Sequence, residues 1–196
     1  MRHSRCRLTH TPAGLAAAIL LAALLILLSG VPTARAQSVQ QGLETLGSNM
    51  SQRLVREGSG TLTLVIADFP NLRGEYCAMG RFVAERLTTQ LATTKGLKVL
   101  ERSVLAQALL EMKLAQADLA DAEKAKQVAL RIGAEAVALG GLSDLGTTVE
   151  LDLRVIRFDT GETLYAGFSS FNKTQGIDAL MRQDCGRGVP PATAIR

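Results

Sequence analysis

Two aspartates occupy the positions in this sequence that most favour chemistry. Asp68 lies near the carboxyl end of an apolar run, 62–69, and Asp144 follows a second such run, 135–142. If both runs are strands of one open sheet, ligands would bind beyond their carboxyl ends. Gly74, in the loop after the first run, would lie at the same edge as the two carboxylates. Asp68, Gly74 and Asp144 therefore form a candidate ligand edge.

Catalysis by the two aspartates is not the expectation. A hydrolase with paired carboxylates needs them within about 5–9 Å of each other and one pKa raised, and the sequence indicates neither. The alternative is that Asp68 accepts hydrogen bonds from the loop 70–74 and that Asp144 accepts them from its own turn, as aspartates commonly do. We expect this second, structural arrangement.

Histidine, the usual general base near neutral pH, is confined to the first ten residues. His3 and His10 are the two histidines of the chain, and both lie in a segment that we expect to be removed. Without them there is no Ser-His-Asp or Cys-His pair and no imidazole metal ligand. Two distant cysteines, Cys77 and Cys185, do not supply a tetrahedral zinc site. We therefore predict that the protein is not an enzyme and that it has no catalytic residue, cofactor or metal ion.

Residues 1–36 have the features of a secretory signal peptide. Arginines within 2–7 precede an unbroken apolar run, 15–28, and Ala34 and Ala36 present small residues at an A-x-A cleavage site. A membrane-spanning helix needs about 20 apolar residues, so the shorter run favours cleavage after Ala36, with a retained N-terminal anchor as the alternative. No cysteine directly follows the run to accept a lipid. These features predict export to the periplasm.

The net charge of +4 arises in this leader. Residues 1–36 contain four arginines and no acidic residue, which leaves 18 basic and 18 acidic residues in 37–196. A neutral chain lacks the charge that drives binding to phosphate backbones, so we predict no nucleic-acid partner. Membrane contact is expected only through a retained anchor or an outer-membrane partner. The oligomeric state stays open.

Cys77 and Cys185 are the cysteines that remain after the leader. Thiols tend to oxidise in the periplasm, so a disulfide between them is one possibility. Two separate thiols are the other, and residue type and spacing do not decide between them.

Helical and strand patterns alternate after the leader. Apolar residues spaced by three and four predict helices from 39 to near 58, from 79 to 96, from Ser103 to 114, and from Asp118 or Asp121 to 132. Apolar or alternating runs predict strands at 62–69, 97–100, 135–142, 149–156 and 163–171.

This order predicts an α/β (α+β) fold. We expect a single domain over 37–175, with a mixed sheet of about five strands, a C-terminal antiparallel hairpin, and helices packed on the sheet. Glycine, proline and alanine accumulate after the hairpin, so 176–196 is expected to be a flexible tail.

The hairpin differs from the earlier strands. In 149–156 apolar and polar residues mostly alternate, which predicts a strand with one face in water. An exposed aromatic ring at Tyr165 or Phe171 would indicate a protein interface, whereas a deep pocket at Asp68 would indicate a small ligand.

Five segments together resemble the FlgO domain. They are 66–69, 79–87, 98–102, 132–141 and 151–156, the last of them followed by Thr160 and Gly161. The family-motif residues within or beside them are Asp68, Phe69, Gly80, Arg81, Glu85, Glu101, Gly133 and Gly140. The FlgO family consists of flagellum-associated envelope proteins, and it is similar in pattern to the periplasmic domains of CsgG-like curli secretion proteins and LpoB-like activators of peptidoglycan synthases.

The resemblance implies a non-enzymatic accessory protein of envelope assembly. Such a protein would be periplasmic or associated with the outer membrane, would act by binding a protein partner, and would be linked to the flagellum. No catalytic residue is transferred, because the family is known for none. The alternative is a small-ligand-binding or regulatory periplasmic domain that uses the sheet edge near Asp68. Family members are often lipoproteins, and the missing lipid-attachment cysteine is a departure from that pattern.

Overall fold

The computed structural model describes residues 38–57 and 60–186, which belong to one compact unit. The predicted signal peptide, 1–36 with its cleavage residues Ala34 and Ala36, lies outside the described residues, as do residues 187–196 of the predicted tail. Within 38–57 and 60–186, no helix has the length and apolar character needed to cross a membrane.

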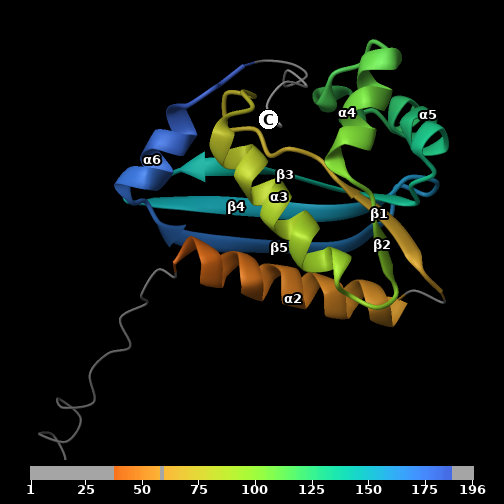
Figure 1. Ribbon diagram of the computed structural model, residues 1–196, viewed down its shortest axis with the longest axis horizontal. Coiled ribbons are helices and arrows are strands. Elements are labelled where there is room, and N and C mark those ends of the chain that lie inside the picture. Colours follow the sequence, from red (N-terminus) through yellow and green to blue (C-terminus); the bar gives the residue numbers. More distant parts are fainter. Residues whose placement is uncertain (1–37, 58–59, 187–196) are drawn as a thin grey trace, which may run out of the picture. The chain divides into compact units, whose positions relative to one another are not determined.

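Helices and strands follow one another in the predicted order as far as the last strand (Figure 1). In chain order they are α2 (Val39–Glu57), β1 (Leu62–Ile66), α3 (Ala78–Ala92), β2 (Leu97–Val99), α4 (Arg102–Glu111), the short 3-10 helix η1 (Gln116–Ala120), α5 (Ala122–Ile132), β3 (Ala136–Asp144), β4 (Thr148–Arg157), β5 (Thr163–Asn172) and α6 (Gln175–Arg182).

The five strands form one mixed sheet in the order β2-β1-β3-β4-β5. β1 pairs in parallel with β2 on one side and with β3 on the other, so that Leu64 lies between Val99 and Ala136. β3, β4 and β5 form an antiparallel meander. The predicted fold class, a single α+β domain with a mixed five-stranded sheet and a C-terminal hairpin, is confirmed.

One face of the sheet, here called the inner face, packs against α2, α3 and α6. Leu43, Leu46 and Met50 of α2 are buried in this core, as is Phe171 of β5. Figure 1 shows α2 running along β5 and α3 crossing the strands. The N-terminal helix is therefore held by the C-terminal hairpin.

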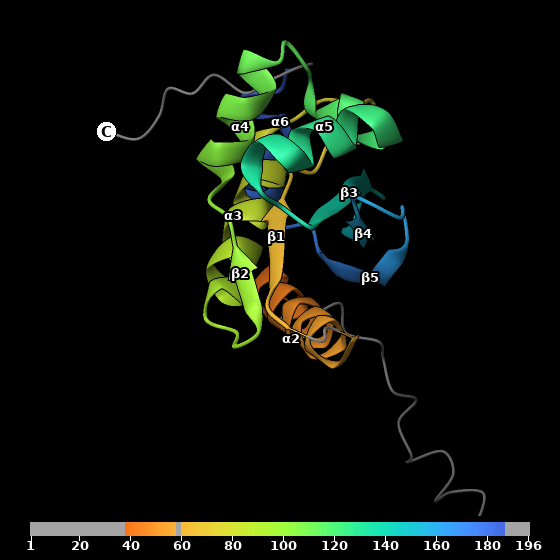
Figure 2. The same ribbon diagram turned by 90° about the vertical axis from the view of Figure 1, so that its right-hand side faces the viewer.

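The opposite, outer face is covered only in part. α4, η1 and α5 pack over β1 and β3, with Val65, Ala67 and Val137 in a second core. Figure 2 shows α4 and α5 at the β1 side of the sheet, while β4 and β5 lie beyond them. β1 is thus buried on both faces, and β4 on one.

The ends of α5 show how local sequence fixes an element. Asp121 accepts hydrogen bonds from the backbone N–H groups of Glu123 and Lys124, and Gly133 takes the left-handed conformation, φ 69°, that ends the helix. Asp121 is one of the two expected starts of this helix, the other being Asp118, and the end at Ile132 is as expected. The expectation that Ser103 begins α4 is wrong, because the helix begins at Arg102 and Glu101 precedes it without a side-chain cap.

Residues 175–182 form a helix, α6, where a flexible tail was expected from 176. Thr174 accepts a hydrogen bond from the backbone N–H of Ile177, and Ile177 and Met181 are buried against the inner face. Gly176 lies in the first turn of α6. Its low helix propensity costs little stability there, because the burial of Ile177 and Met181 stabilises the helix.

Candidate functional site

Asp68 is buried, and its carboxylate is fully engaged. Its Oδ2 accepts a hydrogen bond from Gln116 Nε2 at 2.9 Å, and its Oδ1 forms an ion pair with Arg102 Nη2. The backbone N–H of Asp68 donates to Gln116 Oε1 at 2.7 Å. The expectation that Asp68 accepts from the loop 70–74 is therefore wrong: its partners come from η1 and α4.

Arg102 extends this contact to a third element. Its Nη1 lies 3.3 Å from Glu85 Oε2, so one guanidinium joins α3, α4 and the end of β1. Burial, and next the charge of Asp68, raise the pKa of the Tyr76 hydroxyl. A carboxylate held by a guanidinium and an amide is poorly placed to transfer protons, and the arrangement favours a structural role.

Asp144 lies in a separate cluster. It accepts hydrogen bonds from Lys173 Nζ at 2.7 Å and from the backbone N–H of Gly146 at 2.9 Å, so its expected role in its own turn is confirmed. The bond from Lys173, followed by that from Gly146, lowers the pKa of Asp144. Lys173 Nζ also lies 2.8 Å from Asp178, and these bonds raise the pKa of Lys173. Asp68 and Asp144 share no partner.

Gly74 has a structural duty in its loop. It adopts φ 75° and donates its N–H to the carbonyl of Asn71 at 2.9 Å, which closes a turn. Asn71 in turn forms a parallel bridge with Leu142, so this loop lies beside the end of β3. The structure therefore brings Gly74 near the strand that leads to Asp144, while Asp68 is committed to the α4 side.

A cavity of about 360 Å³ lies elsewhere, between α5 and the turn that joins β4 to β5. Its lining residues are Lys126, Ala129, Leu130, Gly133, Ala134, Glu135, Arg157, Phe158 and Asp159. None of Asp68, Gly74 and Asp144 lines this cavity. The cavity therefore does not coincide with the candidate ligand edge.

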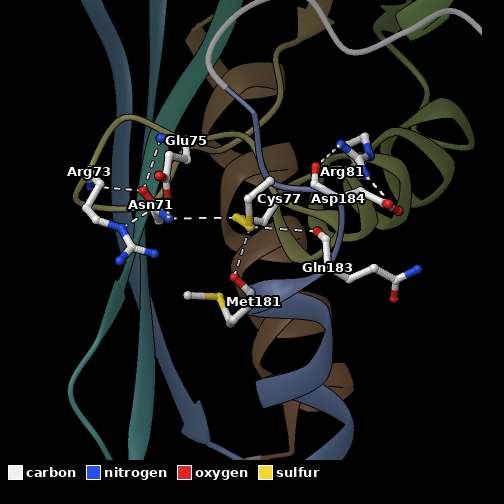
Figure 3. Close-up of a disulfide and its surroundings, with 9 residues drawn as sticks. Asn71, Arg73, Glu75, Cys77, Arg81, Met181, Gln183 and Asp184 are labelled. Atoms are coloured by element: carbon white, nitrogen blue, oxygen red, sulfur yellow. Dashed lines mark hydrogen bonds and ion pairs between the residues drawn. A yellow bond between two sulfur atoms is a disulfide. The ribbon is translucent and has the colours of Figure 1, made fainter.

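Cys77 and Cys185 are joined by a disulfide, with sulfur atoms 2.07 Å apart (Figure 3). The segment 183–186 is also held by backbone hydrogen bonds, from Ala78 N–H to the Gln183 carbonyl and from Tyr76 N–H to the Gly186 carbonyl, both 2.9 Å. The Glu75 carboxylate lies within 4.8 Å of both sulfurs, but sulfurs bonded to each other are not thiolate ligands. The bond ties the end of α6 to the start of α3.

Three family-motif residues meet where a side chain would not fit. A Cβ atom on Gly80 would lie 1.9 Å from the carbonyl oxygen of Phe69, and one on Gly140 would lie 1.9 Å from the carbonyl oxygen of Asp152 and 3.0 Å from the Phe69 ring. The missing side chain of Gly80 lets α3 lie close to the backbone of Phe69, and that of Gly140 lets β3 lie close to the backbone of β4.

The other motif residues also hold elements together. Arg81 lies 3.5 Å from the carboxylate of Asp184, and Glu85 pairs with Arg102. Glu101 precedes α4, and Gly133 ends α5. In the described residues the motif thus marks packing and pairing positions.

The outer face of β4 and β5, which we call the open face, carries polar and small side chains and one phenylalanine. Its residues are Glu150, Asp152 and Arg154 of β4 and Ala166, Phe168 and Ser170 of β5, and each β4 residue is paired with a β5 residue. Phe168 is 72% exposed, whereas Phe171 is buried and Tyr165 half-buried. The exposed aromatic ring of the hairpin is therefore Phe168, and neither Tyr165 nor Phe171 meets the condition that would have indicated an interface at those positions.

Residue parity explains the open face. Tyr165 and Phe171 are an even number of positions apart and share the inner face, while Phe168 has the other parity. The sequence contained this signal, because Phe168 pairs with Asp152 on a strand that was expected to be wet on one face. Arg102 and Gln116 carried no such signal, because they are 34 and 48 residues from Asp68.

Comparison with known families decides the identity of the domain. The model of the family described as "Curli production assembly/transport component CsgG" matches residues 30–150, more than half of the chain. The chain belongs to the CsgG family. This CsgG-family domain confirms the expected CsgG-like pattern at the family level, while membership of the FlgO family stays a prediction. A search of curated proteins finds no match.

Solved structures show the same fold as this CsgG-family domain. The LpoB C-terminal domain from Salmonella enterica is 21% identical, with a TM-score of 0.55, and the match covers 68% of this chain and 97% of that one. The NMR structure of E. coli LpoB is 20% identical, with a TM-score of 0.54, and the match covers 74% of each chain. At this identity the likeness concerns the fold, and it confirms the LpoB-like architecture.

Proposed function

We propose that this CsgG-family chain is a non-enzymatic accessory protein of envelope assembly, which acts in the periplasm by binding another envelope protein through its open face. The family description, a component of curli production assembly and transport, supports a role in the envelope. A leader with the features of a signal peptide supports export. The most specific part of the proposal is a link to the flagellum, which the FlgO resemblance implies.

The exposed ring of Phe168 carries the choice of surface. A phenylalanine that is 72% exposed at the middle of a sheet face loses contact with water when a partner docks, and aromatic side chains with charged neighbours are typical anchors of protein interfaces. Asp152 is its direct cross-strand neighbour, and Arg154 lies two residues along β4. These charges would orient a partner around the ring.

A small ligand at Asp68 is less well supported. The carboxylate of Asp68 already binds Arg102 and Gln116, and a ligand would have to displace one of them. Such displacement would leave a buried charged group without its partner, which is costly. The contacts of Asp68 therefore favour the protein-binding function over the alternative.

Photo-crosslinking in living cells tests the proposed surface. A photoreactive phenylalanine analogue would replace Phe168 or Arg154, with the same analogue at Leu72 as a control, since Leu72 is 78% exposed but lies in the loop 70–74. We expect adducts with a second, different protein from positions 168 and 154 and few from position 72. Equal adducts at all three positions, or none, would contradict the proposed surface.

Complementation separates binding from folding. In a deletion strain, Arg154→Glu and Phe168→Ser should restore envelope assembly less well than wild type, while Leu72→Ser restores it fully. Circular dichroism and thermal unfolding should be unchanged for all three variants, because these side chains are exposed. Motility of the same strains tests the flagellar link: intact swimming in the deletion strain would remove that part of the proposal and leave the rest.

A further inference from the structure

The two cysteines of the disulfide differ in their exposure to solvent. Cys77 is buried, with 3% of its surface exposed, whereas Cys185 lies in the exposed segment 182–186. Thiol–disulfide exchange needs the direct approach of one sulfur to another, so access decides which sulfur of a bonded pair a thiol from outside reaches first. That sulfur is the one of Cys185.

The surroundings of the Cys77 sulfur favour negative charge. Asn71 Nδ2 donates a hydrogen bond to Cys77 Sγ at 3.7 Å. Cys77 also directly precedes α3, and the N-terminal end of a helix stabilises a thiolate placed there. Cys77 is therefore suited to leave as a thiolate when the bond opens, because a stabilised leaving group departs faster.

The surroundings of the Cys185 sulfur have the opposite character (Figure 3). The carbonyl oxygens of Met181 and Gln183 lie 3.4 and 3.8 Å from Cys185 Sγ. Oxygen lone pairs disfavour a thiolate beside them and accept a hydrogen bond from a protonated thiol. The Glu75 carboxylate lies within 4.8 Å of both sulfurs, so its charge does not distinguish them. Cys185 is therefore the sulfur that is attacked, and Cys77 the one that leaves.

Backbone hydrogen bonds hold the two cysteines together independently of their covalent bond. Tyr76 and Gly186 form an antiparallel bridge, in which the Tyr76 N–H donates to the Gly186 carbonyl at 2.9 Å. The Ala78 N–H donates to the Gln183 carbonyl at 2.9 Å. These bonds flank the cysteines on both sides, so a free Cys77 sulfur stays beside Cys185 and can attack it intramolecularly.

We infer that Cys185 is the point at which thiol–disulfide exchange enters this chain, and that Cys77 is the resolving cysteine. The partner in the exchange is a dithiol–disulfide oxidoreductase, a protein that carries a redox-active cysteine pair. The exposure of Cys185, the burial of Cys77 and the hydrogen bond from Asn71 carry this assignment. It concerns how the disulfide is made and opened, and it does not depend on partner binding at the open face.

Oxidation of the reduced pair then takes two exchanges. Cys185 loses its thiol proton and attacks one sulfur of the oxidised partner, so that a mixed disulfide forms, the partner's own disulfide breaks, and its other sulfur leaves as a thiolate. The Cys77 thiolate next attacks Cys185 Sγ, which forms the Cys77–Cys185 bond and breaks the mixed disulfide. Two electrons pass to the partner, whose two thiolates take up the two protons that the cysteines lose. A reduced dithiol partner opens the bond by the same steps in reverse.

Reaction with glutathione tests which sulfur is attacked. The full chain with Cys6→Ser, which removes the one cysteine outside the disulfide, would be exposed briefly to reduced glutathione while folded, and then quenched with acid and alkylated. Trypsin separates the two cysteines into peptides 74–81 and 183–187, so mass spectrometry identifies the adduct on each. The same chain in denaturant is the control, because both sulfurs are accessible there.

In the folded chain we expect glutathione on Cys185 at least about tenfold more often than on Cys77, and nearly equal adducts in denaturant. Two single-cysteine chains in the same background give an independent measurement, because neither can form the bond. With oxidised glutathione, Cys77→Ser should form its adduct at least about tenfold faster than Cys185→Ser. An adduct mainly on Cys77, equal adducts in the folded chain, or equal rates for the two folded variants would overturn the inference.

Asn71→Asp tests the leaving group separately. The carboxylate keeps an oxygen for the backbone N–H groups of Arg73 and Glu75, but it replaces the N–H donated to Cys77 by a negative charge. Opening of the bond by glutathione should be at least about threefold slower than in Asn49→Asp, a matched change at an exposed position of α2. Equal opening rates, with both variants folded by circular dichroism, would overturn the role of Cys77 as the leaving thiolate. If Asn71→Asp does not fold, the position of the adduct in the Cys6→Ser chain decides.

Discussion

The parallel and antiparallel halves of the sheet differ in how many of their faces are covered. β1, in the parallel half, is covered on both faces: Leu64 and Ile66 enter the inner core, while Val65 enters the outer one. In the antiparallel half, Leu153 of β4 is buried and its neighbour Arg154 is exposed. Strands of parallel sheets are continuous apolar runs for this reason, whereas a strand with one wet face alternates.

This difference separates fold from function within one domain. Substitutions at Leu64, Val65 or Ile66 of β1 disturb packing whichever way the side chain points. In the antiparallel half, every second residue is available to a partner without loss of the core. The two halves should therefore differ in their sensitivity to substitution as they differ in structure.

Loss of the disulfide should have the largest effect, because it connects the two halves. Cys77 follows β1, and Cys185 follows α6, at a sequence separation of 108. Cross-linking so long a loop stabilises by up to about 4–5 kcal/mol in the chain-entropy account. We expect the Cys77→Ala/Cys185→Ala variant to lose about 4 kcal/mol in denaturant unfolding, and reduced wild type to lose a similar amount. Thiol labelling of denatured, unreduced protein provides the check: two reactive thiols from these positions would mean that no bond forms.

Removal of Arg102 should come next, as a break in the covered half. Arg102→Ala would leave the buried carboxylate of Asp68 without its cation, at a cost of about 3 kcal/mol. The control is Arg131→Ala, which removes an exposed pair with Glu111 and should cost under about 1 kcal/mol.

A double variant sharpens this second prediction. Asp68→Asn combined with Arg102→Ala removes the carboxylate charge that Arg102→Ala alone leaves unpaired. The double variant should therefore lose less free energy of unfolding than the sum of the losses in the two single variants. Strict additivity, measured by urea unfolding, would mean that Arg102 and Asp68 do not act as a pair.

Two adjacent glycines of β3 compare the faces directly. A Cβ atom on Gly140 would lie 1.9 Å from the carbonyl oxygen of Asp152, whereas one on Gly141 would lie 3.4 Å from the carbonyl oxygen of Pro70. Gly140→Ala should therefore cost about 3 kcal/mol through overpacking, and Gly141→Ala less than about 1 kcal/mol. Equal losses in thermal unfolding would show that the two faces tolerate crowding alike.

The smallest effect is expected at Lys173, in the open half, and it depends on pH. Hydrogen bonds from Lys173 lower the pKa values of Asp144 and Asp178. Groups with lowered pKa values stabilise the fold above their unfolded pKa, about 3.9, and lose that contribution as the pH falls through the folded value. The stability advantage of wild type over Lys173→Met should hold from about pH 5 to 8 and shrink below about pH 4. The raised pKa of Lys173 predicts that the advantage also fades in strong alkali, above about pH 10. A difference constant down to about pH 2 would contradict the ion pairs as its cause.

Local signals in the sequence predicted much of the fold. α5 is capped by Asp121, one of the two starts expected, and ends at Ile132 as expected, because a cap acts within its own turn. The alternation of 149–156 predicted the wet face of β4 for a similar reason. Ser103 was misplaced as a helix start. α6 was missed because the glycine, proline and alanine after the hairpin indicated a flexible tail, while the burial of Ile177 and Met181 depends on the distant inner core.

The candidate site was less accessible to sequence reasoning. Gln116, 48 residues from Asp68, supplies partners for both its backbone and its carboxylate, and nothing near Asp68 indicates that choice. Phe168 could have been identified from parity alone, since Tyr165 and Phe171 oppose it. Long-range polar partners thus need the structure, whereas the face of a strand residue does not.

The position of the disulfide also sets an order of events during biosynthesis. A ribosome makes Cys77 long before Cys185, and the intervening residues include every strand after β1. Cys77 therefore cannot form this disulfide until α6 and Cys185 have been synthesised. The bond can form only in a chain that already contains the hairpin and α6. A chain truncated before residue 185 would keep Cys77 without its disulfide partner.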